Sequence, residues 1–172
     1  MKAFRYCPAC GSGDIHFDGV KELHCNACSF TYFHNVAAAA AAILEYDEKI
    51  MFVRRAREPR KGLLDLPGGF TDPNESTEDG LSRELKEELG ITLNKMKYLG
   101  SAPNIYRYKG VTYNTCDLFF YSKLETLPSE FDKSEIESLE LMDASKVEKS
   151  EFAFKSTEKG IELLIRHLSN LT

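Results

Sequence analysis

Three glutamates, Glu84, Glu87 and Glu88, lie at positions i, i+3 and i+4 of one short segment. If that segment is a helix, the three carboxylates share about one quarter of its circumference. Like charges this close repel each other by about 0.2–0.5 kcal/mol per pair, and several hard oxygen ligands together select Mg²⁺ or Mn²⁺. The spacing therefore predicts a divalent metal site, with a solvated charged helix face as the plainer alternative.

The ends of this helix can also be predicted from the sequence. Ser76 can cap the amino terminus with Asp79 as its partner three residues later, and Gly90 can adopt the left-handed conformation that ends a helix. We therefore expect a helix over residues 77–89. Its apolar row, which would pack on a core, consists of Leu81, Leu85 and Leu89.

Gly80 lies in the middle of this predicted helix. A glycine there costs about 1 kcal/mol relative to alanine. We therefore expect that a neighbouring segment packs closely against Gly80.

The residues around the glutamates form a longer pattern, G-x5-E-x7-R-E-U-x-E-E-x-G-U, in which U is aliphatic. It begins at Gly69, continues through Glu75 and Arg83, and ends with Gly90 and Ile91. This pattern resembles the Nudix box of the MutT-like Nudix hydrolase superfamily. The resemblance implies metal-dependent hydrolysis of the pyrophosphate bond in a nucleoside diphosphate linked to another moiety.

The resemblance also implies roles for individual residues. Glu84, Glu87 and Glu88 would hold Mg²⁺ or Mn²⁺, and Arg83 and Glu75 would orient the helix and the ligand carboxylates. The preceding residues 66–69 resemble the family's LPGG turn, in which the carbonyl of the second glycine, here Gly69, commonly joins the metal shell. Standing alone, Pro-Gly-Gly would indicate an ordinary tight turn.

One carboxylate would act as the general base, and the family does not use the same one throughout. Glu84 is one candidate. Glu135 is another, because its segment looks like the downstream acidic loop of related zinc-ribbon Nudix enzymes. Glu137 is the third choice, and a solvated loop acid is the plain alternative for Glu135.

Four cysteines form a second motif near the amino terminus. Cys7 and Cys10 form one CxxC pair, Cys25 and Cys28 form another, and fourteen residues separate the pairs. This spacing is typical of a zinc ribbon, in which four thiolates surround one tetrahedral Zn²⁺. Two disulfides are the competing interpretation, but the sequence gives no indication of secretion.

The predicted ribbon, residues 1–35, has as many acidic as basic residues and therefore no net charge before the metal site is counted. A nucleic-acid reader would normally be basic there, so we expect a structural module that contacts a second copy in a homodimer or covers the substrate. The metal would supply folding free energy that about 35 residues cannot obtain from a core alone. Residues 36–172 would form the Nudix domain.

Composition narrows the class of protein further. The chain has 172 residues, 42% of them hydrophobic, and a net charge of −5, which argues against nonspecific nucleic-acid binding. No signal peptide is visible, and no apolar run approaches the roughly 18–20 residues that cross a bilayer. We expect a cytoplasmic protein with no membrane partner and a small-molecule nucleotide substrate.

The fold implied by the resemblance is an α/β/α sandwich with a mixed sheet, preceded by the ribbon. Residues 36–44 contain six consecutive alanines, and propensity alone favours a helix there. The family instead places a central strand at this position. A second strand would follow at residues 49–55.

After the box, strands are expected at residues 95–101, 106–108 and 111–122, the last two joined by a turn at Lys109 and Gly110. A carboxy-terminal helix is expected to pack on the core. Its apolar row follows the i, i+3, i+4, i+7 spacing and consists of Ile161, Leu164, Ile165 and Leu168.

The substrate is less well defined by the sequence. A zinc ribbon before a Nudix domain is similar to the NADH pyrophosphatase group, but residues 101–106 replace that group's SQPWPFPxS array. Tyr108 lies seventeen residues beyond Ile91, a spacing that resembles dinucleoside polyphosphate hydrolases. Tyr106 and Tyr108 are therefore candidates for base stacking, with packing of the hairpin as the alternative.

Two function classes follow. The first is a hydrolase of NADH, ADP-ribose, a dinucleoside polyphosphate or a nucleotide sugar. The second is a Nudix-like sensor or regulator that binds such nucleotides without turnover. A complete set of acidic box residues favours the hydrolase.

Overall fold

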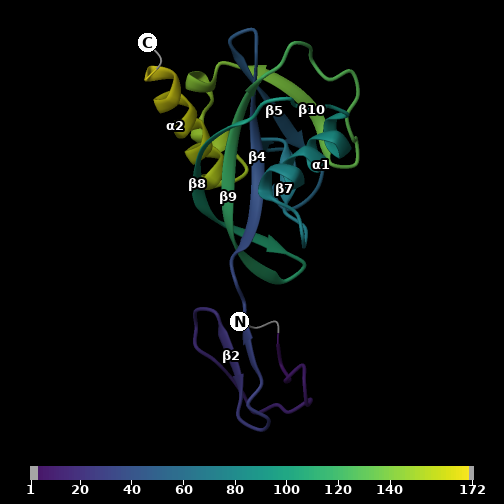
Figure 1. The fold of residues 1–172 in the computed structure, drawn as a ribbon, viewed down its shortest axis with the longest axis vertical. Coiled ribbons are helices and arrows are strands. Elements are labelled where there is room, and N and C mark those ends of the chain that lie inside the picture. Colours follow the sequence, from purple (N-terminus) through teal and green to yellow (C-terminus); the bar gives the residue numbers. More distant parts are fainter. Residues whose placement is uncertain (1–3, 171–172) are drawn as a thin grey trace.

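The computed structural model describes residues 4–170 and contains two separate sheets (Figure 1). The smaller sheet is antiparallel and lies below the main body of the molecule in Figure 1, where one stretch of chain leads from it into β4. Its strands are β1 (Ile15–Phe17), β2 (Glu22–Cys25) and β3 (Thr31–Phe33).

The larger sheet is mixed, and its main strands run in the order β10-β5-β4-β9-β8. Only β4 and β9 pair in parallel; the other pairs in this sheet are antiparallel. Two short strands pair with β5 and β4, namely β6 (Leu64–Asp65) and β7 (Gly68–Phe70). The main strands are β4 (Ala37–Tyr46), β5 (Lys49–Arg55), β8 (Lys97–Tyr108), β9 (Val111–Lys123) and β10 (Ile136–Met142).

Two α-helices cover opposite faces of this sheet (Figure 1). Helix α1 (Thr77–Leu89) packs in a core with the sheet residues Ala40, Ala42 and Leu44. Helix α2 (Lys155–Ser169) packs in a second core with Ile43, Phe52 and Phe119. The 3-10 helices η1 (Ala144–Lys146) and η2 (Lys149–Glu151) precede α2. The expected mixed sheet between helices is confirmed. No helix among residues 4–170 combines the length and apolar composition of a bilayer span.

The alanine-rich segment is the central strand β4, as the family resemblance predicted. It pairs with β9 from Ala37 to Glu45 and with β7 from Ala39 to Ala41. These long-range hydrogen bonds override the helix propensity of alanine, which is a weak local preference. The glycine at position 68 also lets β7 approach β4 closely, because a Cβ at Gly68 would lie 2.2 Å from the carbonyl oxygen of Ala40.

Helix α1 begins and ends where the sequence predicted. The hydroxyl of Ser76 accepts a hydrogen bond from the backbone N–H of Asp79 at 3.1 Å, and Gly90 ends the helix with φ of 66°. Gly80 is buried, and a Cβ there would lie 3.0 Å from a carboxylate oxygen of Glu75. The close packing expected at Gly80 is therefore confirmed.

The segment after α1 differs from the prediction. Strand β8 is continuous from Lys97 to Tyr108, whereas we expected separate strands at residues 95–101 and 106–108. Pro103 lies within β8, which is an edge strand, where proline need not donate to a second neighbour. The turn at Lys109 and Gly110 is confirmed, with both residues at positive φ.

The buried face of α2 also differs in phase from the predicted row. Ile161 and Leu164 are buried as expected, but Ile165 and Leu168 are 44% and 37% exposed. The buried side of the helix starts one turn earlier and includes Ser156, Thr157 and Gly160. Small and polar residues carry no hydrophobic signal, so periodicity alone placed the stripe too late.

Gly160 lies where α2 crosses β9, and a Cβ there would lie 2.6 Å from the ring of Phe119. Phe119 is 1% exposed and has no room to move. We predict that Gly160→Val lowers the free energy of unfolding by about 2–3 kcal/mol through overpacking, as measured by denaturant titration. Ile165→Ala on the exposed side of α2 is the control and should change it by less than about 0.5 kcal/mol. Equal effects would contradict the packing described.

Candidate active site and cysteine cluster

Glu84 and Glu88 project from α1 into a cavity beside β7. Glu88 is 9% exposed, and its carboxylate accepts a hydrogen bond from the backbone N–H of Gly68 at 2.8 Å. Burial raises the pKa of Glu88 to about 8 and also raises the pKa of Glu84. A cation between these carboxylates would favour their charged forms, so the site is suited to a divalent ion.

Arg83 connects the helix to the segment that precedes it. Its Nε donates to Glu75 at 2.8 Å, one Nη donates to Glu84 at 2.7 Å, and the other donates to the carbonyl of Phe70 at 3.1 Å. Glu87 lies farther away, at 3.4 Å from the guanidinium. The hydrogen bond from Arg83 lowers the pKa of Glu75, so the pair stays charged.

Gly69 is in tight contact with this cluster. A Cβ at Gly69 would lie 2.5 Å from the carboxyl carbon of Glu84. A side chain there would displace Glu84, so glycine allows the backbone of β7 to approach the carboxylate. A backbone segment and two carboxylates thus share one small space, which suits the oxygen ligands of Mg²⁺ or Mn²⁺.

Glu87 is placed differently from the other two glutamates. Its side chain is 62% exposed and does not line the cavity. Among residues 4–170 the four cysteines are the only group of at least three potential metal ligands whose donor atoms lie within 4.8 Å of one another. The three box carboxylates share a helix but are not gathered this closely, because Glu84 pairs with Arg83 and Glu88 with Gly68.

Glu135 also lines the cavity and forms an ion pair with Arg57. Its backbone carbonyl accepts from the N–H of Ala56 at 2.8 Å, and the N–H of Asp132 donates to the carbonyl of Glu88 at 2.8 Å. The loop that carries Glu135 is thus fastened to both β5 and α1. Glu137 lies in a separate shallow hollow with Lys61 and Lys133.

The cavity has a volume of about 220 Å³ and extends well beyond the glutamates. Most of the side chains at its far end were not predicted from the sequence. A signal was available in the alternation of β9, where Thr115, Asp117 and Phe119 fall on one face, but the register with β4 and β8 was needed to place them. The missed lining residues include Arg55, Arg57, Asp65, Asn104, Thr115, Asp117, Phe154 and Thr157.

Asp65 joins three elements in the wall of this cavity. Its carboxylate accepts from Arg55 at 2.9 Å and from the hydroxyl of Thr157 at 2.9 Å. Burial raises the pKa of Asp65, and the positive charge of Arg55 opposes that shift. The guanidinium of Arg55 also lies over the ring of Phe154, 5.3 Å from its centroid. Arg55 is therefore held in the wall.

The two candidate tyrosines occupy different places. Tyr106 lines the cavity, with its ring 5.5 Å from that of Phe70 and 5.7 Å from that of Phe154. Tyr108 is 42% exposed and does not line the cavity, and the ammonium of Lys109 lies over its ring. The structure thus brings Tyr106, but not Tyr108, to the cavity that holds Glu84 and Glu88.

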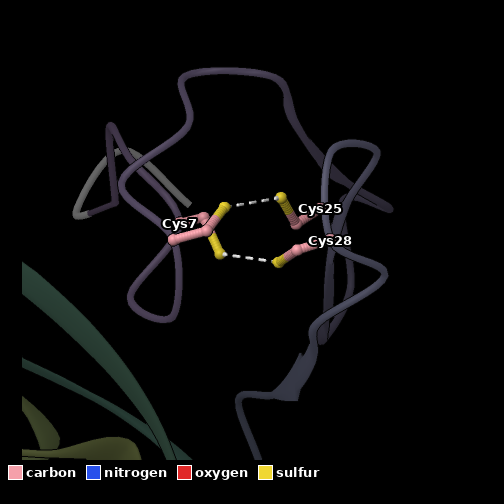
Figure 2. A group of neighbouring side chains, drawn as sticks. Cys7, Cys25 and Cys28 are labelled. Atoms are coloured by element: carbon pink, nitrogen blue, oxygen red, sulfur yellow. Dashed lines mark hydrogen bonds between the residues drawn. The ribbon is translucent and has the colours of Figure 1, made fainter.

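The four cysteines converge in the amino-terminal module. In Figure 2 the labelled side chains of Cys7, Cys25 and Cys28 point toward one another from two segments of chain. The sulfurs of Cys7 and Cys28 are 3.7 Å apart, as are those of Cys10 and Cys25. Zn–S bonds of about 2.3 Å imply tetrahedral edges of about 3.8 Å, and all four thiols are free. The geometry therefore fits one zinc ion.

The histidines near the cysteines have other partners. His24 is within hydrogen-bonding distance of the Thr31 hydroxyl, at 3.2 Å. His34 lies 3.2 Å from the carbonyl of Thr112, and its ring is 6.0 Å from that of Tyr113. His34 thus brings the end of the small module into contact with the β8–β9 hairpin.

Solved structures with a similar fold include several Nudix proteins. A MutT Nudix hydrolase from Burkholderia pseudomallei has 23% identity and a TM-score of 0.65, covering 75% of this chain and 98% of its own. A Nudix hydrolase from Nitrosomonas europaea, with 19% identity and a TM-score of 0.61, covers 95% of this chain and 93% of its own. The NUDIX domain of Shewanella oneidensis NrtR, solved with ADP-ribose, has 21% identity and a TM-score of 0.61, covering 78% and 89%.

Curated relatives include the NAD-capped RNA hydrolases NudC of Pseudomonas fluorescens and Vibrio parahaemolyticus. The first is 30% identical over 99 residues, which are 56% of this chain and 35% of the relative. The second is 26% identical over 102 residues, which are 59% and 39%. The match thus spans little more than a third of these relatives. The family model of the NUDIX domain matches residues 34–163, and the chain therefore belongs to the NUDIX domain family.

Proposed function

We propose that this chain is a metal-dependent pyrophosphohydrolase, which cleaves the pyrophosphate bond of a nucleoside diphosphate linked to another moiety. The observation that supports it most directly is the shared cavity, where Glu84 and Glu88 of α1, the backbone of Gly69 and the carboxylate of Glu135 all meet. Bound Mg²⁺ or Mn²⁺ would supply Lewis-acid stabilisation of the phosphoryl oxygens and a water of lowered pKa.

Individual residues would have separate roles in metal binding and positioning. Glu84, Glu87 and Glu88, with the carbonyl of Gly69, would hold the metal ions, and rotation of the exposed Glu87 side chain would bring it to them. Arg83 and Glu75 act as positioning residues, because their ion pair fixes Glu84 relative to β7.

Glu135 is our choice for the general base. It lines the same cavity as Glu84, whereas Glu137 does not line it. Glu84 is engaged by Arg83 and is also a proposed metal ligand, so its carboxylate oxygens are already occupied. Arg57, the partner of Glu135, is more than half exposed and can move to a substrate phosphate when Glu135 turns toward water.

The substrate class follows from the cavity and from the relatives. NADH, ADP-ribose, dinucleoside polyphosphates and nucleotide sugars all contain the required bond. The relatives named NAD-capped RNA hydrolases add the NAD-capped end of RNA to this set. The decisive assay measures phosphate released from each product by a phosphatase, with Mg²⁺ or Mn²⁺ present. Binding without turnover across the whole panel would instead support a nucleotide sensor or regulator.

The remaining expectations belong to the same proposal. The ribbon would comprise residues 1–35 and the Nudix domain residues 36–172, with zinc holding the ribbon together. Zinc thiolates persist in a reducing compartment, which is why we place the protein in the cytoplasm. The homodimer is also still a prediction, and the particle mass in solution tests it.

We predict that Glu87→Gln lowers kcat by at least about a hundredfold, because a charged ligand of the metal is lost. Glu78→Gln on the same helix is the matched control, because Glu78 is exposed and lies in the first turn. It should keep near-normal turnover. Initial rates at saturating Mg²⁺ and substrate measure the effect, and normal turnover of Glu87→Gln would contradict its role as a ligand.

We also predict that Glu135→Gln lowers kcat by about 10²–10⁴-fold with little change in KM, as loss of a general base does. Glu137→Gln, two residues along the same segment but outside the cavity, should leave both constants nearly unchanged. Steady-state kinetics of the two variants make the comparison. If Glu137→Gln were the more damaging change, the assignment of the base would be wrong.

Cys7→Ser should release zinc and destabilise the amino-terminal module, because three thiolates hold the ion less tightly than four. Metal analysis is expected to give one zinc per chain for the unchanged protein and much less for the variant. Cys116→Ser, outside the cluster, is the control and should retain zinc. One zinc per chain in Cys7→Ser would refute the site.

A further inference from the structure

The cavity has a second end that the proposed hydrolysis does not use. Its floor is formed by β4 and β9, where Ala39 lies beside Asp117 and Ala41 beside Phe119. Because the two alanine side chains are only methyl groups, they leave space above the sheet there. Three aromatic rings line the wall. The ring of Tyr106 contacts that of Phe70 on one side and that of Phe154 on the other.

Asp117 carries the carboxylate at this end. One of its oxygens accepts from the hydroxyl of Thr115 at 2.6 Å, and the other accepts from the amide nitrogen of Asn104 at 2.9 Å. The amide oxygen of Asn104 accepts from the backbone N–H of Ile105 at 2.8 Å, which fixes the direction of the amide. The Asp117 carboxylate is therefore held in one orientation by two neighbouring strands.

The hydrogen-bonding capacity of Asp117 is only partly used. An ionised carboxylate can accept about four hydrogen bonds, and two are supplied here. Within residues 4–170, Asp117 forms no salt bridge. A half-buried carboxylate without a cation is costly unless further donors reach it, and the cavity is where such donors can enter.

The charges of the residues that line the cavity restrict which chemical groups can bind beside Asp117. The cavity wall has six carboxylates and two guanidinium groups. Arg55 is committed to Asp65, and Arg57 lies with Glu135 at the other end. Among the described residues that line the cavity, both cations are thus already paired, so an additional phosphate beside Asp117 would face a carboxylate without an unpaired cation to offset it. A group that binds there is therefore favoured if it is uncharged or positively charged and carries hydrogen-bond donors, N–H or O–H.

The size of the cavity limits the group to one ring system. Its 220 Å³ is less than the roughly 300–1,000 Å³ of pockets that hold a whole drug-sized ligand. A flat ring lying on the alanine floor would meet the aromatic wall at its face or edge. The rest of the substrate would extend toward Glu84 and Glu88.

We infer that this end of the cavity holds the heterocyclic base of the substrate and that Asp117 selects bases carrying an amino group. The amino N–H donates to the free lone pairs of Asp117, while Asn104 and Thr115 act as positioning residues for that carboxylate. A base with a carbonyl or a hydrogen at the same place leaves Asp117 unpaired and binds more weakly. This inference rests on the proposed function, because it names the base of that substrate.

Nucleoside monophosphates test the inference without turnover, because they contain no pyrophosphate bond. Calorimetric titration compares AMP with purine riboside 5′-monophosphate, and GMP with IMP, each pair differing by one amino group. We expect one amino-bearing member to bind at least about tenfold more tightly than its partner, in keeping with the loss of a hydrogen bond to a charged group. In Asp117→Asn the ratio should fall below about threefold, because a neutral amide oxygen is a weaker acceptor for the amino N–H than a carboxylate.

The alanine floor has its own matched pair of variants. Ala39→Leu fills the space above β4 and should weaken every nucleotide at least about tenfold. Ala38→Leu adds the same side chain to the neighbouring position, which is exposed and does not line the cavity, and should bind normally. Thermal unfolding of both variants checks that each one is folded.

The outcomes separate this inference from the proposed function. Equal binding of both members in both pairs, or an unchanged ratio in Asp117→Asn, would overturn the role of Asp117 even if pyrophosphate is hydrolysed. Normal binding to a folded Ala39→Leu variant would overturn the location of the base. An amino-group preference in a protein that hydrolyses nothing would support the inference and contradict the hydrolase.

Discussion

The guanidinium of Arg83 lies among the carboxylates of Glu75, Glu84 and Glu87 and the carbonyl of Phe70. These groups belong to the helix, to the loop before it and to the end of β7. Carboxylates in a partly buried cleft repel one another and lose hydration. One fixed positive charge in their midst offsets part of that cost, because a planar guanidinium can bond several acceptors at once.

The close approach of α1 and β7 depends on two residues without side chains. Gly69 leaves room for the Glu84 carboxylate, and Gly68 leaves room for the backbone of Ala40. Gly68 also donates its N–H to Glu88. In the acidic cluster, the backbone of β7 therefore lies directly against the carboxylates of Glu84 and Glu88. The rigid helix and sheet fix the distance between that backbone and these carboxylates.

The first and last residues of α1 could be predicted from local sequence signals. Ser76, Gly90 and the leucine row each act within a few positions, so they are visible in sequence. The continuity of β8 and the buried face of α2 depend on contacts with β9, which is distant in sequence from Gly160. Pro103 pairs with Cys116 of β9, and Gly160 packs against Phe119 of β9.

The same reasoning applies to the candidate site. The box pattern identified Glu84 and Glu88 because its residues are close in sequence. Asn104 and Asp117 meet only through the register of the β8–β9 hairpin, with Ala102 opposite Asp117 and Asn104 opposite Thr115. No spacing rule connects them to the box, so the far end of the cavity required the three-dimensional structure.

Strand β4 lies between two crowded layers, with Ala40 and Ala42 toward helix α1 and Ala39 and Ala41 toward the cavity. One extra methyl group would press on the helix on one face or reduce the cleft on the other. Four of the six alanines, Ala39 to Ala42, thus have little room for a larger side chain, although they bear no reactive group. Their contribution is the volume they leave unfilled.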